Sequence, residues 1–196
     1  GRAIAERFAM EGADVAVCAR NGDEVAETVA ALQGMGVKAT GGSVDVGDEA
    51  ALKTWIDKAA NELGGLDALV ANVSALAGDE TEAAWRAAFE IDVMGTIHTV
   101  DAALPHIEKS DAGAIVAISS VSALQFFGGA RPYNTMKAAL INHMSNLAHV
   151  LAPKGIRVNT VSPGTIYFEG GVWNKREVEM PEFYQGALAS NPMGRM

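Results

Sequence analysis

Apolar positions along the chain alternate between two spacings, one typical of helices and one typical of strands. Apolar side chains recur every three or four positions, which predicts helices, over residues 2–11, 22–36, 47–65, 79–107 and 131–155. Short apolar runs predict strands within residues 12–20, 37–46, 66–73, 113–120 and 156–164, the first of them a buried strand. After Gly164 the pattern loosens, with one short helical pattern near residues 181–190. The alternation predicts an α/β fold, a doubly wound parallel sheet flanked by helices on both faces.

Composition and charge narrow the classes of function. Of the 196 residues, 49% are hydrophobic and 20% are charged, which is typical of a globular protein. No repeat or linker interrupts the chain, so we expect a single domain over residues 1–196. The net charge of −9 provides no basic stripe, so no nucleic-acid partner is expected. No apolar run is long enough to span a bilayer, so no membrane partner is expected.

Cysteine and histidine usage narrows the setting further. Cys18 is the single cysteine, which excludes an internal disulfide. The N-terminal stretch carries charges where a signal peptide would be apolar, so a reducing, cytoplasmic location is expected. The four histidines show no metal-ligand spacing, so no metal site is expected.

Polar residues that follow the predicted strands are the candidates for chemistry, because ligands of such sheets bind at the carboxyl ends of the strands. Ser120 ends the strand predicted within residues 113–120, and its hydroxyl is suited to orienting a carbonyl oxygen. Tyr133 and Lys137, four positions apart, share a face of the next helix. A nearby ammonium lowers the pKa of a phenol, so this tyrosine is suited to general acid–base catalysis. A turn-capping serine and a surface Tyr–Lys pair are the alternative interpretations.

These residues together resemble the short-chain dehydrogenase/reductase family. Ser120 stands thirteen residues before Tyr133, and Tyr-x-x-x-Lys follows. Other stretches resemble family segments in the same order: "GRAIAERFA" the end of the glycine-rich turn, "VDV" (44–46) the adenine contact, "LDALVANVSAL" the Asn-Asn-Ala-Gly segment, and "VSPG" the turn beside the nicotinamide. The resemblance covers essentially the whole chain. It implies a Rossmann-type fold and an NAD(P)-dependent oxidoreductase that interconverts a small-molecule carbonyl and an alcohol.

The resemblance also implies roles for individual residues. Tyr133 would protonate the carbonyl oxygen that Ser120 orients, while Lys137 would lower the tyrosine pKa and hold the nicotinamide ribose. The implied cofactor-binding residues are Gly1, Arg20, Asp45, Val46, Asn72, Tyr133, Lys137, Pro163, Gly164 and Ile166. The region after Gly164 would form a mobile lid over the substrate.

The chain departs from the family pattern at several positions. Asp92 stands where the family usually has a catalytic asparagine, and we include it among the catalytic residues. Its carboxylate near Lys137 would stabilise the ammonium, and an ordinary helix aspartate is the alternative. Only Asn72 remains of the Asn-Asn-Ala-Gly segment, followed by Val73 and Ser74, and Phe168 replaces an expected threonine.

The end of the strand predicted within residues 12–20 bears on the choice of cofactor. An acidic residue there would hold the adenine ribose hydroxyls, but this strand ends in Ala19 and Arg20. An arginine is suited to gripping the 2′-phosphate. NADP(H) is therefore favoured, with NAD(H) as the alternative.

Apolar residues near the predicted site indicate an apolar ketone or secondary alcohol as the substrate. The candidate pocket residues are Leu124, Phe126, Phe127, Tyr167, Phe168 and Trp173, with ordinary packing as the alternative. The helices over residues 85–107 and 133–151 are unusually apolar. By resemblance they would form the interface of a homodimer or homotetramer; the alternative is that they only cover the sheet.

Two further hypotheses stay open. The altered Asn72 segment and Asp92 are compatible with a catalytically quiet dinucleotide-binding or scaffolding protein. The sequence also begins with a helix directly after Gly1, where the resemblance places a preceding strand that pairs between those at 12–20 and 66–73. No closing strand follows "NPMGRM". We therefore expect the natural chain to be longer at both ends, which would make these residues an inactive fragment.

Overall fold

A computed structural model describes the chain from Gly1 to Met196. The chain divides into two compact units, Gly1–Val161 and Ser162–Met196. Each unit is described by itself, and the expectation of one domain over residues 1–196 stays a prediction.

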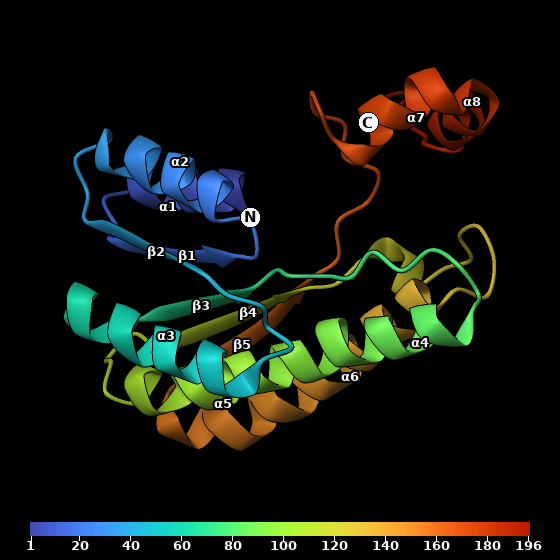
Figure 1. Cartoon of the computed structure of the whole chain (residues 1–196). Helices are drawn as coiled ribbons and strands as arrows, with labels where there is room; N and C mark the ends of the chain where they lie inside the picture. Colours follow the sequence, from blue (N-terminus) through green and yellow to red (C-terminus); the bar gives the residue numbers. More distant parts are fainter. The chain divides into compact units, whose positions relative to one another are not determined.

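The strands of the first unit are all parallel and form two sheets (Figure 1). In the smaller sheet β1 (Val15–Ala19) pairs with β2 (Ala39–Ser43). In the larger sheet β4 (Ala114–Ile118) lies between β3 (Ala68–Ala71) and β5 (Arg157–Val161). Parallel neighbours need crossover connections, which here are helices. The carboxyl ends of β3, β4 and β5 therefore meet at one edge of the larger sheet.

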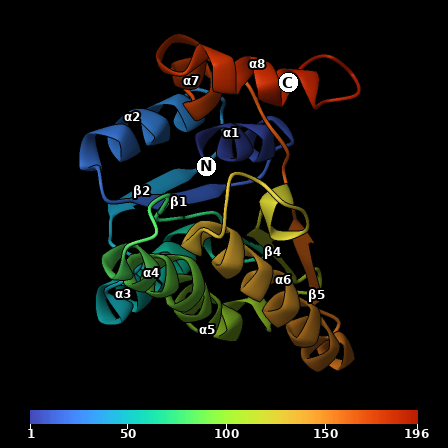
Figure 2. The same cartoon turned by 90° about the vertical axis from the view of Figure 1, so that its right-hand side faces the viewer.

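Helices cover both faces of the strands, which confirms the predicted fold class. They are α1 (Arg2–Met10), α2 (Gly22–Gln33), α3 (Glu49–Leu63), α4 (Glu82–Ala88), α5 (Gly95–Ile107) and α6 (Pro132–Leu151). A π-helix, η1 (Phe89–Met94), joins α4 to α5, so the long helix predicted over residues 79–107 is continuous but irregular. Figures 1 and 2 show α1 and α2 on one face of β1 and β2, and α3, α5 and α6 on the opposite side. None of the helices has the length and apolar content that crossing a membrane requires.

Side-chain caps fix where several helices begin. Asn21, Asp48 and Thr81 each accept a hydrogen bond from a backbone N–H in the first turn of α2, α3 and α4 respectively. Such a cap satisfies an N–H group that has no partner within the helix, and it typically stabilises the helix by about 1 kcal/mol. The α3 helix ends at Gly64, whose φ of 86° lies in the left-handed region that glycine adopts without strain.

The main hydrophobic core lies between the sheets and the helices α3, α5 and α6. Its fully buried side chains include Leu52, Ile107, Ile115 and Met144. Burying one such side chain stabilises the fold by about 1.5–3 kcal/mol. The core thus fixes α5 and α6 against β4 and positions the residues at the carboxyl end of that strand.

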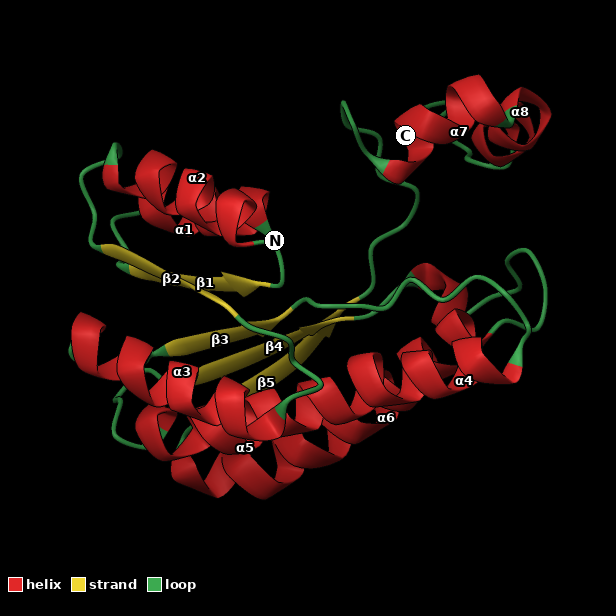
Figure 3. Ribbon diagram, in the orientation of Figure 1, coloured by secondary structure: helices red, strands yellow, loops and turns green.

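Figure 3 shows the strands of the two sheets in yellow. A cavity of about 840 Å³ is lined by β1, β3 and parts of α1 and α5. β1 pairs only with β2, and β3 pairs only with β4, so each has one edge without a strand partner. The prediction of a buried strand within residues 12–20 is wrong in its burial: every residue of β1 is only half-buried, because one edge of the strand faces this cavity. The further strand that the resemblance places here stays a prediction.

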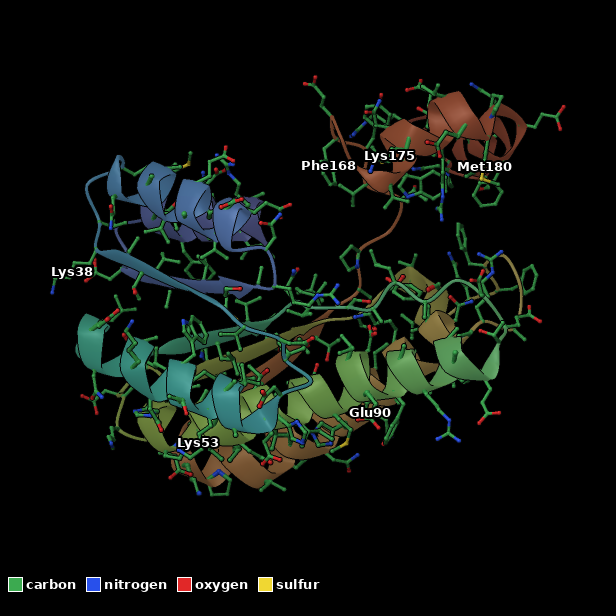
Figure 4. The ribbon with its side chains drawn as sticks, in the orientation of Figure 1. Lys38, Lys53, Glu90, Phe168, Lys175 and Met180 are labelled. Carbon is green, nitrogen blue, oxygen red and sulfur yellow. The ribbon has the colours of Figure 1, made fainter.

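The second unit contains two short helices, α7 (Val172–Glu179) and α8 (Pro181–Ala189). Trp173 stacks on Phe183 with ring centroids 5.8 Å apart, and the Arg176 guanidinium lies over both rings. The helix near residues 181–190 is confirmed. The helix α7 was not predicted, because its short and mostly polar sequence shows no clear apolar periodicity. Figure 4 labels Phe168, Lys175 and Met180 on this unit.

Candidate active site

Three of the predicted catalytic residues lie together at the carboxyl end of β4. Ser120 follows β4 and caps the 3₁₀ helix η2 (Val121–Ala123), accepting a hydrogen bond of 3.2 Å from the Ser122 N–H. Tyr133 and Lys137 lie in the first two turns of α6 on the same face, with the Lys137 ammonium 5.7 Å from the centre of the Tyr133 ring. The Tyr133 hydroxyl shares a hydrogen bond with Ser120. The fold therefore brings the serine and tyrosine hydroxyls to one point.

Lys137 is buried and held from two sides. Lys137 is only 2% exposed. The ammonium donates a hydrogen bond of 2.9 Å to the Ile118 carbonyl oxygen at the end of β4. It also forms an ion pair of 3.0 Å with Oδ1 of Asp92. A buried ammonium needs such partners, since an isolated charge in the interior is strongly unfavourable.

Asp92 lies within the π-helix η1 and is 0% exposed. Its Oδ2 accepts a hydrogen bond of 2.9 Å from the Ala75 N–H, in the segment that follows β3. The Thr96 hydroxyl donates a hydrogen bond of 2.7 Å to the Asp92 carbonyl oxygen. Asp92 therefore joins the segment after β3 to Lys137 on α6. The structure places this aspartate beside Lys137, and its membership of the catalytic residues stays a prediction.

The acidity of Tyr133 differs from the expectation. We expected Lys137 to lower the pKa of this tyrosine, but the pKa of Tyr133 is raised above its ordinary value. Burial of the phenol is the main cause, and the negative charge of Asp92 adds to it, whereas the hydrogen bond with Ser120 acts in the opposite direction. The expected lowering is therefore wrong, because burial of the phenol, with the charge of Asp92, raises the pKa of Tyr133 more than the Ser120 hydrogen bond lowers it.

Asn134, between the tyrosine and the lysine, has a structural role that the sequence interpretation missed. Its side-chain amide donates hydrogen bonds of 3.1 Å to the carbonyl oxygens of both Phe127 and Gly129. The loop needs such an anchor, because Gly128 and Gly129 adopt φ values of 69° and 116°. The signal was present in the sequence as an amide next to Tyr133, following two consecutive glycines in the preceding loop.

The predicted cofactor residues of the first unit lie near the ends of β1, β2 and β3. Arg20 follows β1 and is exposed, and its carbonyl oxygen accepts a hydrogen bond from the Ser43 hydroxyl. Asp45 is exposed and accepts a hydrogen bond from the Gly47 N–H, so its carboxylate stabilises a turn. Val46 is buried against Gly95, where an added Cβ would lie 2.8 Å from Val46 Cγ2.

The remaining two cofactor residues of this unit, Gly1 and Asn72, are neighbours. A Cβ added at Gly1 would lie 3.4 Å from Asn72 Nδ2. Both residues line the cavity between the sheets. Pro163, Gly164 and Ile166 belong to the second unit.

The predicted pocket residues divide between the two units. Leu124 and Phe126 are exposed, Phe126 by 88%, and Phe127 is half-buried beside Ser120 in sequence. Tyr167 and Phe168 are exposed residues of the second unit. Trp173 is 8% exposed and packs within that unit against Phe183 and Tyr184. Trp173 therefore contributes to the packing of α7 on α8.

The residues present fit a dinucleotide. An ammonium has three N–H donors. That of Lys137 donates a hydrogen bond to the Ile118 carbonyl oxygen and pairs with the charge of Asp92, which leaves N–H groups for a ribose hydroxyl. Arg20 offers an exposed cation at the end of β1, which suits an anionic phosphate. Within residues 1–196 no three His, Cys, Asp or Glu side chains are grouped as a metal site.

Comparison with known proteins agrees with this arrangement. Residues 1–177 match the short chain dehydrogenase family. The chain is 34% identical over its whole length to the isoepoxydon dehydrogenase of Penicillium expansum and covers 77% of that protein. It is 40% identical to dehydrogenase/reductase SDR family member 4 of Sus scrofa, over 85% of this chain and 61% of that one.

Solved structures show the same likeness. A NAD⁺-bound xylitol dehydrogenase superposes with a TM-score of 0.90 at 28% identity, over 100% of this chain and 81% of the other. A short chain dehydrogenase from Burkholderia cenocepacia in complex with NADP gives a TM-score of 0.81 at 31% identity, over 90% of this chain and 76% of the other. The protein therefore belongs to the short-chain dehydrogenase/reductase family of oxidoreductases.

Proposed function

We propose that this protein catalyses reversible hydride transfer between NADP(H) and an apolar ketone or secondary alcohol. The single observation that carries the proposal is the convergence of Ser120 and Tyr133 on one point, with the buried Lys137 ammonium beside the tyrosine ring. Hydroxyl donors at a fixed position are suited to a carbonyl oxygen on which negative charge develops.

The roles of the residues follow from their contacts. The Ser120 hydroxyl donates a hydrogen bond to the substrate oxygen and holds it at Tyr133. The Tyr133 hydroxyl delivers a proton to that oxygen during reduction and removes it during oxidation. The Lys137 ammonium donates a hydrogen bond to the Ile118 carbonyl oxygen, and a remaining N–H would bind a ribose hydroxyl of the dinucleotide. The bound dinucleotide supplies or accepts the hydride, and the protein contributes position and electrostatics.

The preference for NADP(H) rests on Arg20. Its guanidinium is exposed directly after β1, and no acidic residue stands at the strand end. An arginine there would pair with a 2′-phosphate, whereas a carboxylate would repel it. Some structural relatives were solved with NAD and others with NADP or NADPH, so both forms of the cofactor bind to proteins of this fold.

The apolar substrate class rests on the loop after Ser120. Leu124 and Phe126 expose large apolar side chains on this loop, and Asn134 holds its backbone at Phe127. Large apolar side chains beside a few polar groups are typical of a site for an apolar ligand. A relative solved with NAD, a carveol dehydrogenase of Mycobacterium avium, acts by its name on a terpenoid alcohol. We also propose a homodimer or homotetramer and a cytoplasmic setting, in keeping with the lone thiol at Cys18.

Titration of this chain with NADPH, and in parallel with NADH, tests the cofactor step through nicotinamide fluorescence. Tighter binding of NADPH supports the role of Arg20. A panel of apolar ketones with NADPH then tests the substrate class, with polyols as the contrasting panel. Preference for NADH, or turnover of polyols alone, contradicts the corresponding part of the proposal.

A further inference from the structure

A fully buried carboxylate lies next to the candidate catalytic lysine. Asp92 is 0% exposed, and both of its side-chain oxygens have defined neighbours: Oδ1 faces the Lys137 ammonium at 3.0 Å, and Oδ2 accepts the Ala75 N–H at 2.9 Å. A carboxylate withdrawn from water requires compensation of this kind. The arrangement therefore fixes a neutral pair, rather than a free positive charge, beside Tyr133.

We propose that Asp92 is a positioning residue that compensates the Lys137 charge and keeps Tyr133 in its protonated, proton-donating form up to alkaline pH. The inference deepens the proposed function, on which it rests for its catalytic consequence. Its electrostatic part concerns only residues of the first unit and does not depend on which substrate is bound.

Charged groups lie near Tyr133 on its own helix and on η1. Lys137 lies on the same helix, and Asp92 faces it from η1. From the end of β4 the Ser120 hydroxyl provides a hydrogen bond but no charge. On the neighbouring loop a Cβ added at Gly129 would lie 3.5 Å from Glu80 Oε1 and 3.9 Å from Arg131 Nε, so one side chain of each charge lies beside that glycine. The charges near the tyrosine therefore sum to approximately zero as long as Asp92 is ionised.

An amide in place of Asp92 would not form this pair. If its oxygen kept the hydrogen bond from the Ala75 N–H, its NH₂ group would face the Lys137 ammonium, and two donors would oppose each other. The ammonium would then keep only the Ile118 carbonyl oxygen as a protein partner. Its uncompensated charge would stabilise the Tyr133 phenolate, because an opposite charge at this range favours the ionised form.

The expected consequence concerns the direction of the reaction. The raised pKa of Tyr133, caused first by burial and then by Asp92, keeps the hydroxyl protonated at neutral pH. A protonated tyrosine can donate to the carbonyl oxygen in the reductive direction. Oxidation of the alcohol needs the deprotonated form, so it should gain rate as the pH rises into the alkaline range.

Ultraviolet titration of tyrosine ionisation tests the electrostatic part without any turnover. The chain has only three tyrosines, so the difference between wild type and Tyr133→Phe isolates the signal of Tyr133. In the wild-type chain we expect Tyr133 to ionise above pH 10, and ionisation below that value overturns the inference. This measurement needs no variant at Asp92 and holds even if such variants fold poorly.

The Asp92→Asn variant tests the residue directly. Its Tyr133 ionisation should shift to lower pH, and the alkaline rise of alcohol oxidation should shift with it. In the double variant Asp92→Asn/Lys137→Met, which also removes the positive charge, the ionisation should return toward the wild-type value. Glu90→Gln is the matched control, because Glu90 lies exposed on the same π-helix (Figure 4) and should change neither value.

The outcomes separate the two proposals. If no ketone is turned over but Tyr133 titrates as described, the proposed function fails while the role of Asp92 stands. If turnover is found and Asp92→Asn leaves both the ionisation and the pH profile unchanged, the role of Asp92 is wrong and the proposed function stands.

Discussion

The Ser119 hydroxyl donates a hydrogen bond of 2.8 Å to the backbone carbonyl oxygen of Lys137. Both residues are buried. Ser119 directly precedes Ser120, so this bond fixes the end of β4 against the helix that carries Tyr133. The two hydroxyl groups of the candidate site are thus held in place by a third hydroxyl that touches neither.

Replacing Ser119 by alanine should lower both stability and turnover. Loss of one buried hydrogen bond should reduce the free energy of unfolding by about 1 kcal/mol. The distance between Ser120 and Tyr133 should become less fixed, so kcat should fall more than KM changes. Urea unfolding and steady-state kinetics measure the two effects. Ser145→Ala is the matched control. Ser145 is exposed on α6, the helix that accepts the Ser119 hydrogen bond, so this variant should leave stability and kcat unchanged.

Tyr133→Phe should abolish turnover while leaving the binding of the dinucleotide intact. The variant removes only the hydroxyl that moves the proton, and loss of a general acid typically lowers the rate about 10²–10⁴-fold. Tyr184→Phe removes a hydroxyl within the second unit and should keep the wild-type rate. An unaffected rate in Tyr133→Phe would contradict the role of Tyr133 as the proton donor.

Arg20→Gln should weaken the binding of NADPH by about tenfold or more and leave the binding of NADH nearly unchanged. A charged hydrogen bond is worth about 1.5–3 kcal/mol, which corresponds to a factor of this size. Arg157→Gln is the control, because it makes the same charge change at the amino end of β5 in the larger sheet. Equal losses in both variants would point to a general effect of net charge instead of a specific contact.

Cys18 should react slowly with alkylating reagents in the folded chain. Burial raises the pKa of the Cys18 thiol to about 11, and only the thiolate reacts. At pH 8 we expect the rate to be roughly 100-fold below that of an unperturbed cysteine, since the pKa is about two units above the ordinary value. Mass spectrometry over time follows the reaction of this single cysteine, and urea should restore the ordinary rate. A fast reaction in the folded chain would contradict the burial of the thiol.

Stability should fall as the pH rises above about 10, and Tyr133 should contribute to this fall. The pKa of Tyr133 is raised in the folded state by burial first and Asp92 second. The unfolded chain loses this proton near pH 10 while the folded chain retains it, so the contribution is fully present below that pH and is lost above it. Urea midpoints between about pH 9 and 11 should fall less steeply in Tyr133→Phe. Equal slopes in the two chains would assign the loss to other groups.

The order of elements was predictable from the sequence, because helices and strands differ in their apolar spacing. Residues near the candidate site show which contacts the apolar spacing can predict and which it cannot. The i, i+4 spacing placed Tyr133 and Lys137 on one face, and α6 confirms this geometry. The neutralising contact from Asp92 depends on η1 packing against α6, and no local pattern contains that information.

The burial of an individual strand could not be predicted from the local sequence pattern either. The apolar residues of β1 predicted a buried strand. Their burial also depends on what lies along the edge of β1 that does not pair with β2, and the local sequence does not contain that information. The helix α7 was missed for a related reason: its stability comes from Trp173 stacking on Phe183 of α8, a contact between residues ten positions apart.

The division of the strands into two sheets has a consequence for how the first unit opens. β4 is hydrogen-bonded on both sides, whereas β1 and β3 are each bonded on one side and meet the cavity on the other. Hydrogen exchange of backbone amides should therefore be slowest in β4 and faster in β1 and β3. No ladder of hydrogen bonds joins β1 to β3. Val44 and Val46, which follow β2, belong to the same core as Ile115 of β4, so side-chain packing holds the two sheets of residues 1–196 together.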